Sequence, residues 1–398
     1  MAKRQILTGN EAAAYGAKLC RPQVVAIYPI TPQSEISEAF AEFAATGKLG
    51  SAKVFRVESE HSAMSILIGA AMIGARTYTA TASNGLFYMH EAMSFAPGAR
   101  LPIVMAVTNR TLSPPWNVWC DHQDSIMMRD TGWLQLYVEN AQEVLDTTIQ
   151  AYKIAEKPDV LLPLMICLDG FQITHLSEGV IVPDQEEVDK FLPPFDSKYG
   201  LDKFLKEDKP VCLAHLSRAE DSFMEYKYLQ AAASENSKKV IEHVDKEFGK
   251  YFGREYGGLV APYKVDDAEV VLVTLGSIST TSRAIVNEFR KDGEKVGAIK
   301  LRAYRPFPSE ELREHLNHVD VIGVVDRDFS CGYTGGVYSD TAAALQNLED
   351  GPKVINFVVG LGGRDVTFDH FRHMLRRLLK VAETGRIEQE AEWIGVRF

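Results

Sequence analysis

The sequence predicts an α/β protein with a doubly wound parallel sheet, followed by a second α/β domain. From residue 5 to about residue 170, short apolar runs typical of strands alternate with longer segments of helical periodicity. The alternation returns from residue 268 onward, after a stretch that is rich in charge and proline. We therefore expect a first domain over residues 1–185, a connector with a long helix over 186–258 and a second domain over 259–398.

The first domain is expected to alternate strands with helices along its length. A helix follows Asn10, and Thr31 is expected to cap a second one that begins at Pro32, because threonine before proline is a common helix start. An N-cap hydroxyl beside free backbone N–H groups can also bind a carboxylate. The remaining expected helices are 62–73 and 141–155, and the expected strands are 24–28, 78–82, 103–108, 134–138 and 160–167.

The connector is expected to end in a charged helix over residues 222–252, whose recurring aromatic residues indicate packing against the rest of the protein. Glycine clusters at 332–336 and 360–363 are interpreted as tight turns, since neither has the G-x-G-x-x-G spacing of a dinucleotide-binding loop. In the second domain we expect strands over 270–275, 296–301, 321–325 and 354–359, and helices over 279–291, 309–317, 339–348 and 365–381.

Composition argues against several classes of function. The 398 residues are 46% hydrophobic and carry a net charge of −11, which disfavours a nucleic-acid-binding surface. No apolar run reaches the roughly 18–20 residues that a membrane helix needs, and the first residues lack the apolar core of a signal peptide, so we expect a cytoplasmic protein that binds no membrane. The cysteines show no C-x-x-C spacing, so no metal or iron–sulfur site is expected in this chain. They are Cys20, Cys120, Cys167, Cys212 and Cys331.

Three polar insertions follow apolar, strand-like runs between residues 28 and 113. In an open α/β sheet, ligands bind outside the carboxyl ends of the strands, so Thr31, Glu60 and Arg110 are expected to converge on one crevice. A guanidinium at a strand end can donate two N–H groups to one carboxylate. Glu58 stands two residues before Glu60, and the spacing does not choose between the two carboxylates.

The loop over residues 111–129 carries two prolines and two nearby tryptophans, Trp116 and Trp119. Such a loop is expected to form a wall over an apolar ligand or a contact with another subunit. Cys120 at its end is expected to be a packed thiol rather than a nucleophile.

Several segments together resemble the α subunit of the thiamine-diphosphate-dependent 2-oxoacid:ferredoxin oxidoreductases, of the pyruvate type. The matching segments follow the family's order over nearly the whole chain. They are Tyr28-Pro-Ile-Thr-Pro, Val57-Glu-Ser-Glu-His-Ser-Ala, Thr79-Ala-Thr-Ala-Ser, Asn109-Arg-Thr-Leu-Ser, Arg129-Asp-Thr-Gly-Trp, Tyr304-Arg-Pro-Phe-Pro and Val359-Gly-Leu-Gly-Gly-Arg-Asp-Val-Thr.

This resemblance implies that the first domain is the pyrimidine-binding half of a thiamine diphosphate site and that residues 259–398 form a transketolase C-terminal-like domain. Glu60 aligns with the carboxylate that hydrogen-bonds the aminopyrimidine ring and promotes the reactive ylid, so it is expected to be catalytic. Tyr28 and Pro29 are expected to contact the cofactor as well. Thr31 and Arg110 are expected to hold the carboxylate of the 2-oxoacid.

The chain lacks the Gly-Asp-Gly segment and following asparagine with which thiamine enzymes bind magnesium and diphosphate. The resemblance implies that a β subunit supplies this half-site, and that Mg and [4Fe-4S] clusters belong to partner chains that include γ and δ subunits. The implied reaction is the reversible, coenzyme A-dependent oxidative decarboxylation of a 2-oxoacid, with electrons passing to ferredoxin.

Pyruvate is the expected substrate, but a branched-chain 2-oxoacid or an aryl glyoxylate remains an alternative because Trp116 and Cys120 depart from the family's usual loop. Oxalate is disfavoured, since the resemblance associates oxalate with an arginine where this chain has Thr31. A non-catalytic scaffold subunit and a non-oxidative thiamine decarboxylase are the rival functions.

Overall fold

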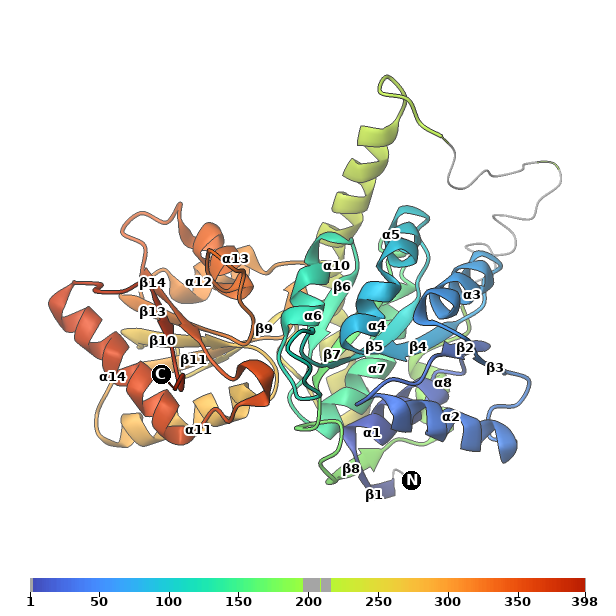
Figure 1. Cartoon of the computed structure of the whole chain (residues 1–398), viewed down its shortest axis with the longest axis horizontal. Helices are drawn as coiled ribbons and strands as arrows, with labels where there is room; N and C mark the ends of the chain where they lie inside the picture. The colour runs from blue at the N-terminus through green and yellow to red at the C-terminus, as the bar shows by residue number, and fades with distance from the viewer. Residues whose placement is uncertain (1–2, 196–207, 209–215, 398) are drawn as a thin grey trace.

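The computed structural model describes residues 3–195, 208 and 216–397, and Cys212 lies outside them. Two α/β lobes lie side by side, each around its own mainly parallel sheet (Figure 1). A short antiparallel pair, β1 (Lys3–Leu7) with β8 (Glu178–Val182), closes the base of the first lobe. Among the described residues, no helix is both long enough and apolar enough to cross a bilayer.

The first lobe contains a seven-stranded sheet in the order β12-β6-β7-β5-β4-β2-β3. Every neighbouring pair is parallel except β12 with β6, so the expected doubly wound parallel sheet is confirmed. The strands are β2 (Val24–Ile27), β3 (Lys53–Arg56), β4 (Thr77–Thr81), β5 (Val104–Asn109), β6 (Leu134–Tyr137), β7 (Leu164–Asp169) and β12 (Ala303–Arg305).

Helices cover both faces of this sheet because its strands are apolar on both sides. Val25 and Ile27 join one core cluster, and Ala26 between them joins the other. The first cluster includes α1 (Gly9–Leu19), α2 (Ser34–Ala45) and α7 (Ala141–Ala155). The second includes α3 (Glu60–Met72), α4 (Ser83–Tyr88) and α5 (His90–Gly98).

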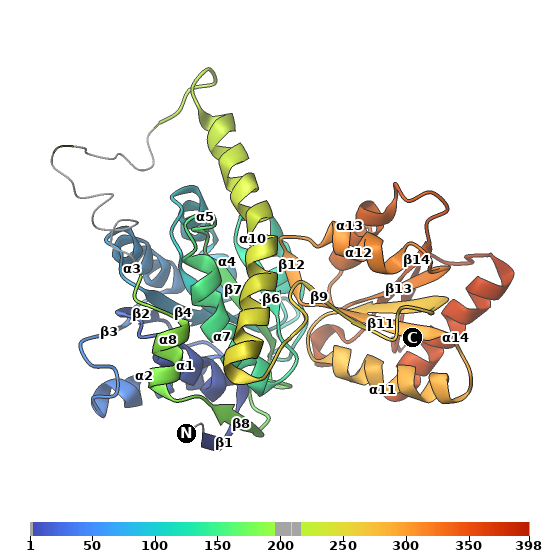
Figure 2. The same ribbon diagram turned by 180° about the vertical axis from the view of Figure 1, so that it is seen from behind.

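The long helix α10 (Phe223–Phe252) confirms the expected charged helix of the connector. Its later turns pack against α7 and α8 (Gln185–Phe191), where Phe248 is fully buried and lies 5.4 Å from Phe191 between ring centroids. Its first turns rise above the lobe (Figure 2), and Phe223 and Tyr228 are exposed there. The packing inferred from its aromatic residues therefore holds for the second half of the helix.

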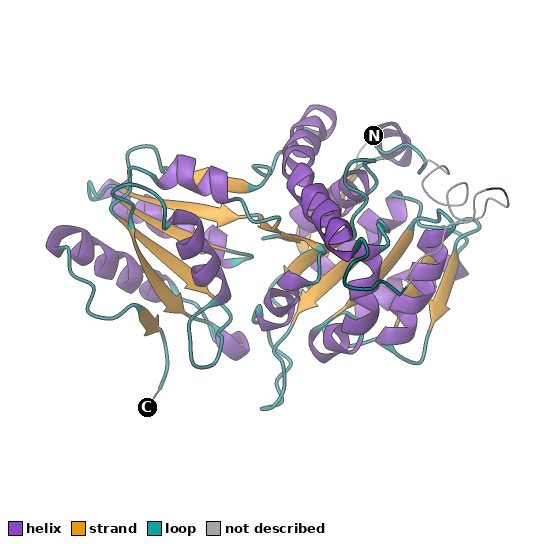
Figure 3. Ribbon diagram, turned by 90° about the horizontal axis from the view of Figure 1, so that it is seen from above, coloured by secondary structure: helices purple, strands orange, loops and turns teal. Residues whose placement is uncertain are grey.

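The second lobe is a six-stranded sheet in the order β15-β14-β13-β10-β11-β9, in which only β9 is antiparallel to its neighbour. Figure 3 shows the two sheets side by side with helices on both faces. The strands of the second lobe are β9 (Val260–Tyr263), β10 (Val270–Thr274), β11 (Val296–Leu301), β13 (Val321–Asp326), β14 (Lys353–Val358) and β15 (Ala391–Trp393). Its helices are α11 (Ile278–Lys291), α12 (Ser309–Leu316), α13 (Gly336–Leu345) and α14 (Phe368–Thr384).

The expectation that Thr31 caps a helix beginning at Pro32 is wrong. A turn forms first, closed by the Gln33 N–H group donating to the Ile30 carbonyl over 2.7 Å, and α2 begins only at Ser34. The Gln33 side chain accepts from the Ile30 N–H group, so the local hydrogen bonds favour the turn over a helical start at Pro32. Thr31 is therefore left exposed on the turn.

Other element ends also differ from expectation by a few residues. β7 starts at Leu164 rather than at residue 160, and Leu161 before it has a left-handed φ of 41°, which no strand residue adopts. α14 starts at Phe368 rather than at residue 365, because the Thr367 side chain accepts from the His370 N–H group as an N-cap. The turn expected at residues 360–363 is confirmed, with φ of 65° at Gly360.

Candidate functional site

The three polar insertions lie at the carboxyl ends of neighbouring strands. Residues 28–33 follow β2, residues 57–63 follow β3 and lead into α3, and residues 108–113 run out of β5. β2 and β5 both pair with β4, and β2 also pairs with β3, all in parallel. The carboxyl ends of these strands therefore lie together along the edge of the sheet that the strand ends form, not along an edge strand. This edge is where an open α/β sheet binds its ligands.

Glu60 is the first residue of α3 and is only 6% exposed. Its carboxylate lies against Gly85 of α4, where a Cβ atom would overlap Glu60 Oε1 and would come within 2.7 Å of Thr81 Oγ1. Thr81 Oγ1 is itself buried without a hydrogen-bond partner among the described residues. Burial raises the pKa of Glu60, because desolvation penalises its charged form. Glu60 is thus a buried carboxyl group that lies against α4, the helix that follows β4.

The structure separates the two carboxylates that the sequence spacing left open. Glu58 is exposed and accepts a hydrogen bond from the Ser62 hydroxyl, which lowers the pKa of Glu58. Burial shifts the pKa of Glu60 in the opposite direction. A pKa raised by burial, in a carboxyl group at the ligand-binding edge of a sheet, is typical of a functional residue. Glu60 is therefore the better candidate.

Thr31 and Arg110, two of the three residues that were expected to converge, are in contact. Arg110 Nη1 donates to the Thr31 carbonyl oxygen over 2.8 Å, although these residues come from different strand ends. Arg110 Nε is buried and has no hydrogen-bond partner in the described part of the chain. A buried guanidinium N–H group left unpaired is suited to an anionic ligand, because a ligand carboxylate would satisfy it. Tyr28 is 36% exposed and Pro29 half-buried just before this turn.

Asp124 holds the neighbouring strand ends together, and the sequence analysis missed it. It lies in the short helix α6 (Gln123–Ile126) and is fully buried. Its Oδ2 atom accepts from the N–H groups of Ser83, over 2.9 Å, and of Arg110, over 3.0 Å. Its Oδ1 atom accepts from Asn109 Nδ2 over 2.8 Å and from the Ser125 N–H group. No local sequence signal reveals this role, because its partners outside α6 come from the start of α4 and from the end of β5.

The loop over residues 111–129, which carries Trp116 and Trp119, lies between the two lobes. Its Asn117 Nδ2 atom donates to the Gly362 carbonyl over 3.0 Å, and the ring centroids of Trp119 and Phe171 are 4.6 Å apart. Trp116 is 79% exposed, so it projects from the loop. Cys120 is fully buried, and burial raises the pKa of its thiol, which confirms the expected packed thiol.

A buried hydrogen-bonded cluster joins the lobes beside this loop. Cys120, His122 and Asp169 place potential ligand atoms within 4.8 Å of one another. However, the Asp169 carboxylate already contacts His122 Nε2 at 2.8 Å and Arg327 Nη1 at 2.6 Å, and it accepts from the Ser277 hydroxyl. The neighbouring charges of Arg327 and His122 hold the pKa of Asp169 well below its usual value. The charges are therefore balanced by the protein itself, and the cluster connects the lobes.

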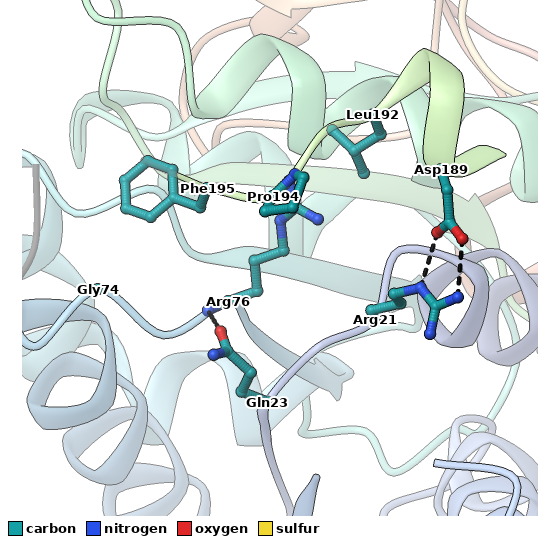
Figure 4. Close-up of a pocket in the computed structure, with 8 residues that line it drawn as sticks. All are labelled: Arg21, Gln23, Gly74, Arg76, Asp189, Leu192, Pro194 and Phe195. Carbon is teal, nitrogen blue, oxygen red and sulfur yellow. Dashed lines mark hydrogen bonds and ion pairs between the residues drawn. The ribbon is translucent and has the colours of Figure 1, made fainter. Parts of the chain in front are cut away.

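A cavity of about 470 Å³ lies at the opposite edge of the first sheet, near the start of β2 and β4 (Figure 4). Its two arginines are already paired. Arg21 donates to both oxygens of Asp189 over 2.7 Å, and Arg76 forms an ion pair with Glu156 over 2.6 Å. Because both guanidinium groups are neutralised and the strands' carboxyl ends lie elsewhere, this cavity is not the candidate site.

Comparisons with known proteins agree with the fold. A family model described as "Pyruvate flavodoxin/ferredoxin oxidoreductase, thiamine diP-bdg" matches residues 15–246. A second, described as "Pyruvate:ferredoxin oxidoreductase core domain II", matches residues 268–371. Solved structures share the fold: a 2-oxoglutarate:ferredoxin oxidoreductase from Magnetococcus marinus superposes with a TM-score of 0.71 at 16% identity, covering 94% of this chain and 65% of that one. A split-gene transketolase superposes with a TM-score of 0.55 at 12% identity, covering 96% and 99%.

Curated relatives are similar over the full length. Pyruvate synthase subunit PorA of Pyrococcus abyssi is 46% identical over 99% of this chain and 98% of its own. PorA of Methanocaldococcus jannaschii is 46% identical over 100% and 99%. Ketoisovalerate oxidoreductase subunit VorA of Pyrococcus horikoshii is 45% identical over 99% and 98%. Since one family model spans more than half of the chain and these relatives span nearly all of it, the chain belongs to the pyruvate flavodoxin/ferredoxin oxidoreductase family and contains its thiamine diphosphate-binding domain.

Proposed function

We propose that this chain is the subunit of a 2-oxoacid:ferredoxin oxidoreductase that supplies the pyrimidine-binding half of the thiamine diphosphate site, and that its 2-oxoacid is pyruvate. The observation that carries the proposal is Glu60, a buried carboxyl group of raised pKa at the ligand-binding edge of a sheet that matches the family's thiamine diphosphate-binding model. Pyruvate is favoured by the full-length relatives named pyruvate synthase subunit PorA.

The residues at this edge suit the cofactor. Glu60 supplies a buried acceptor, Gly85 leaves space beside it that a Cβ atom would fill, and Thr81 Oγ1 lacks a partner among the described residues. When bound, thiamine diphosphate supplies the nucleophilic carbon and the electron sink for decarboxylation. Glu60 would accept a hydrogen bond from the ring and hold its proton in place, and Tyr28 and Pro29 would line the approach.

Substrate binding is assigned to Arg110 and Thr31. The guanidinium group of Arg110 is fixed at Nη1 by the Thr31 carbonyl, and its Nε–H group remains to donate to the carboxylate of the 2-oxoacid. Partial burial strengthens that interaction because the surroundings screen charge less than water does. This chain therefore orients the acid for loss of carbon dioxide.

The relatives are named as subunits, so partner chains complete the enzyme. We propose that a β subunit supplies the diphosphate and Mg half-site, that partner chains including γ and δ subunits carry the [4Fe-4S] clusters, and that ferredoxin accepts the electrons. Coenzyme A would accept the acyl group as co-substrate. The cysteine spacing supports clusters in other chains, because none of the five cysteines stands in a C-x-x-C segment. A cytoplasmic location remains a prediction.

A branched-chain 2-oxoacid is the second candidate substrate. The VorA relatives, named ketoisovalerate oxidoreductase subunits, are 45% and 44% identical to this chain, close to the values for PorA. The exposed Trp116 also alters the loop beside the site. Glu60 and Arg110 would have the same roles with either acid, so the two candidate functions differ only in the substrate.

The test is viologen reduction by the native complex, purified through a tag on this chain and supplied with coenzyme A. Separate reactions receive pyruvate, 2-oxobutyrate, 2-oxoisovalerate, phenylglyoxylate and oxalate. We expect the highest kcat/KM with pyruvate and no reduction without coenzyme A. Preference for 2-oxoisovalerate would replace pyruvate by the second candidate. No reduction with any acid, from a complex that contains thiamine diphosphate and clusters, would favour the scaffold function instead.

A further inference from the structure

We propose that Asp124 is a positioning residue that sets the place of Arg110 in the 2-oxoacid site. This inference rests on the proposed function, because it assumes that Arg110 binds the carboxylate of the substrate. Within the described residues, Asp124 forms no hydrogen bond or ion pair with Glu60 or Thr31; it acts on the backbone that carries Arg110.

The geometry is that of a clamp between two strand ends. One carboxylate oxygen accepts from the N–H group of Ser83, after β4, and from that of Arg110, after β5, over 2.9 and 3.0 Å. The other accepts from the Asn109 side chain over 2.8 Å. A single carboxylate thus fixes the distance between two segments. One follows β4 and carries Gly85 beside Glu60, and the other follows β5 and carries Arg110, the proposed substrate-binding residue.

The backbone on one side of this clamp needs support. Ser83 has a φ of 50°, a left-handed conformation that is uncommon for residues other than glycine. Its N–H group donates to Asp124, and its hydroxyl group donates to the carbonyl of Thr111, the residue after Arg110. The two contacts tie Ser83 to both sides of Arg110, so releasing one of them would let the β5 end move relative to β4.

Charge supplies the second part of the argument. Asp124 is fully buried and faces Arg110, Asn109, Ser83 and Ser125. Its negative charge opposes the cost of burying the Arg110 guanidinium group. An asparagine would keep the size of the side chain, but its NH2 group would face N–H donors and it would carry no charge, so two hydrogen bonds would be lost.

The experiment is the steady-state kinetics of the purified complex carrying Asp124→Asn, with pyruvate and coenzyme A varied in turn. We expect the KM for pyruvate to rise about tenfold, the effect of losing one charge-assisted hydrogen bond between the displaced Arg110 and the substrate carboxylate. The KM for coenzyme A should stay within about twofold. Asp146→Asn is the matched control: Asp146 is equally buried but pairs with Arg254, away from the site. It is expected to lower thermal stability without raising the KM for pyruvate.

Two further variants distinguish positioning from mere structural support. If Asp124 acts through Arg110, Asp124→Asn should raise the KM for pyruvate by less than about threefold in an Arg110→Lys background. The reason is that the guanidinium group positioned by Asp124 is already absent from that background. Asp124→Glu keeps the charge and displaces it by one methylene group, and it is expected to raise the KM for pyruvate at least about threefold. It also serves where Asp124→Asn prevents assembly.

The inference is overturned if Asp124→Asn and Asp124→Glu leave the KM for pyruvate within about twofold of the wild-type value while Arg110→Lys raises it. In that case the proposed function stands without a role for Asp124. Equal effects of Asp124→Asn in both backgrounds would also overturn it. If Arg110→Lys alone leaves the KM for pyruvate unchanged, the proposed role of Arg110 fails, and the positioning role fails with it.

Discussion

At the scale of single residues, the contact between Glu60 and Gly85 makes a sharp prediction. A Cβ atom at position 85 would overlap the Glu60 carboxylate and the Thr81 hydroxyl group. Gly85→Ala should therefore displace Glu60 and lower kcat/KM by more than about tenfold, with a loss of about 1–3 kcal/mol in the free energy of unfolding. Gly69→Ala, in the same helix as Glu60, is the control, because a Cβ atom there meets nothing within 4 Å. Equal activities of the two variants would contradict the contact.

A second prediction at this scale concerns pH. Burial raises the pKa of Asp121 from 3.8 to about 6. The folded protein thus binds a proton at Asp121 more tightly than the unfolded chain does, and this side chain lowers the free energy of unfolding as pH rises from about 4 to about 6. Asp121→Asn removes that dependence. The Tm of the variant minus that of the wild type should therefore increase between pH 4 and pH 6, as scanning calorimetry would measure; a constant difference would contradict the pKa.

The sequence identified some site residues and missed others for a physical reason. Thr31 and Arg110 were predictable as neighbours because each follows a strand of the same parallel sheet. The choice of Glu60 over Glu58 needed the resemblance to a family, since only burial separates the two. Asp124 could not be found at all, because its role depends on the separation of two strand ends that only the folded sheet defines.

At the scale of elements, α10 is divided into a packed half and an exposed half. Phe248 is fully buried against Phe191, whereas Phe223 is 59% exposed. Phe248→Ala should cost about 3–5 kcal/mol in the free energy of unfolding, through lost burial and the cavity left behind. Phe223→Ala should change it by less than about 0.5 kcal/mol. Denaturant unfolding of the full chain measures both, and similar losses would show that the two halves pack alike.

The elements themselves followed from periodicity, but their ends did not. α10 and the inner strands of both sheets lie close to their expected positions, because α10 is a long periodic segment and these strands are continuous apolar runs. The starts of α2 and α14 moved by two and three residues, from 32 to 34 and from 365 to 368, where single side-chain hydrogen bonds of Gln33 and Thr367 decide the outcome. The sequence did not predict the edge strands β3, β9, β12 and β15 or the β1–β8 pair, because these strands are very short or only partly buried and so lack a continuous apolar run.

At the scale of the whole molecule, buried ion pairs join the two lobes. Asp169 and Arg327 are both fully buried, 2.6 Å apart, and Lys300 forms a second buried pair with Glu143. Arg327→Ala would leave the Asp169 carboxylate buried with less compensation, so it should lower the free energy of unfolding by about 3–5 kcal/mol. Lys295→Ala, which breaks an exposed pair with Glu269, should leave the free energy of unfolding nearly unchanged, because water and salt screen that pair. Equal costs would mean that the buried pair does not hold the lobes together.

This interface could not be predicted from the sequence. Its partners are 158 residues apart for Arg327 and Asp169, and 157 residues apart for Lys300 and Glu143. The sequence indicated two α/β units from the return of the alternation after the connector, but it holds no local pattern for their contact. The boundaries at residues 185 and 258 remain predictions, and β12, from beyond the second boundary, pairs with β6 in the first sheet.

The central claim is that Glu60 is the catalytic carboxyl group of this chain. The most direct test compares the purified complexes carrying Glu60→Gln and Glu58→Gln in viologen reduction with pyruvate and coenzyme A. The two residues are close in sequence, but Glu58 is exposed and Glu60 is buried. Loss of a carboxylate that positions a proton should lower kcat by about 10²-fold or more for Glu60→Gln. Glu58→Gln should retain nearly full activity. Full activity of Glu60→Gln in an assembled complex would contradict the account.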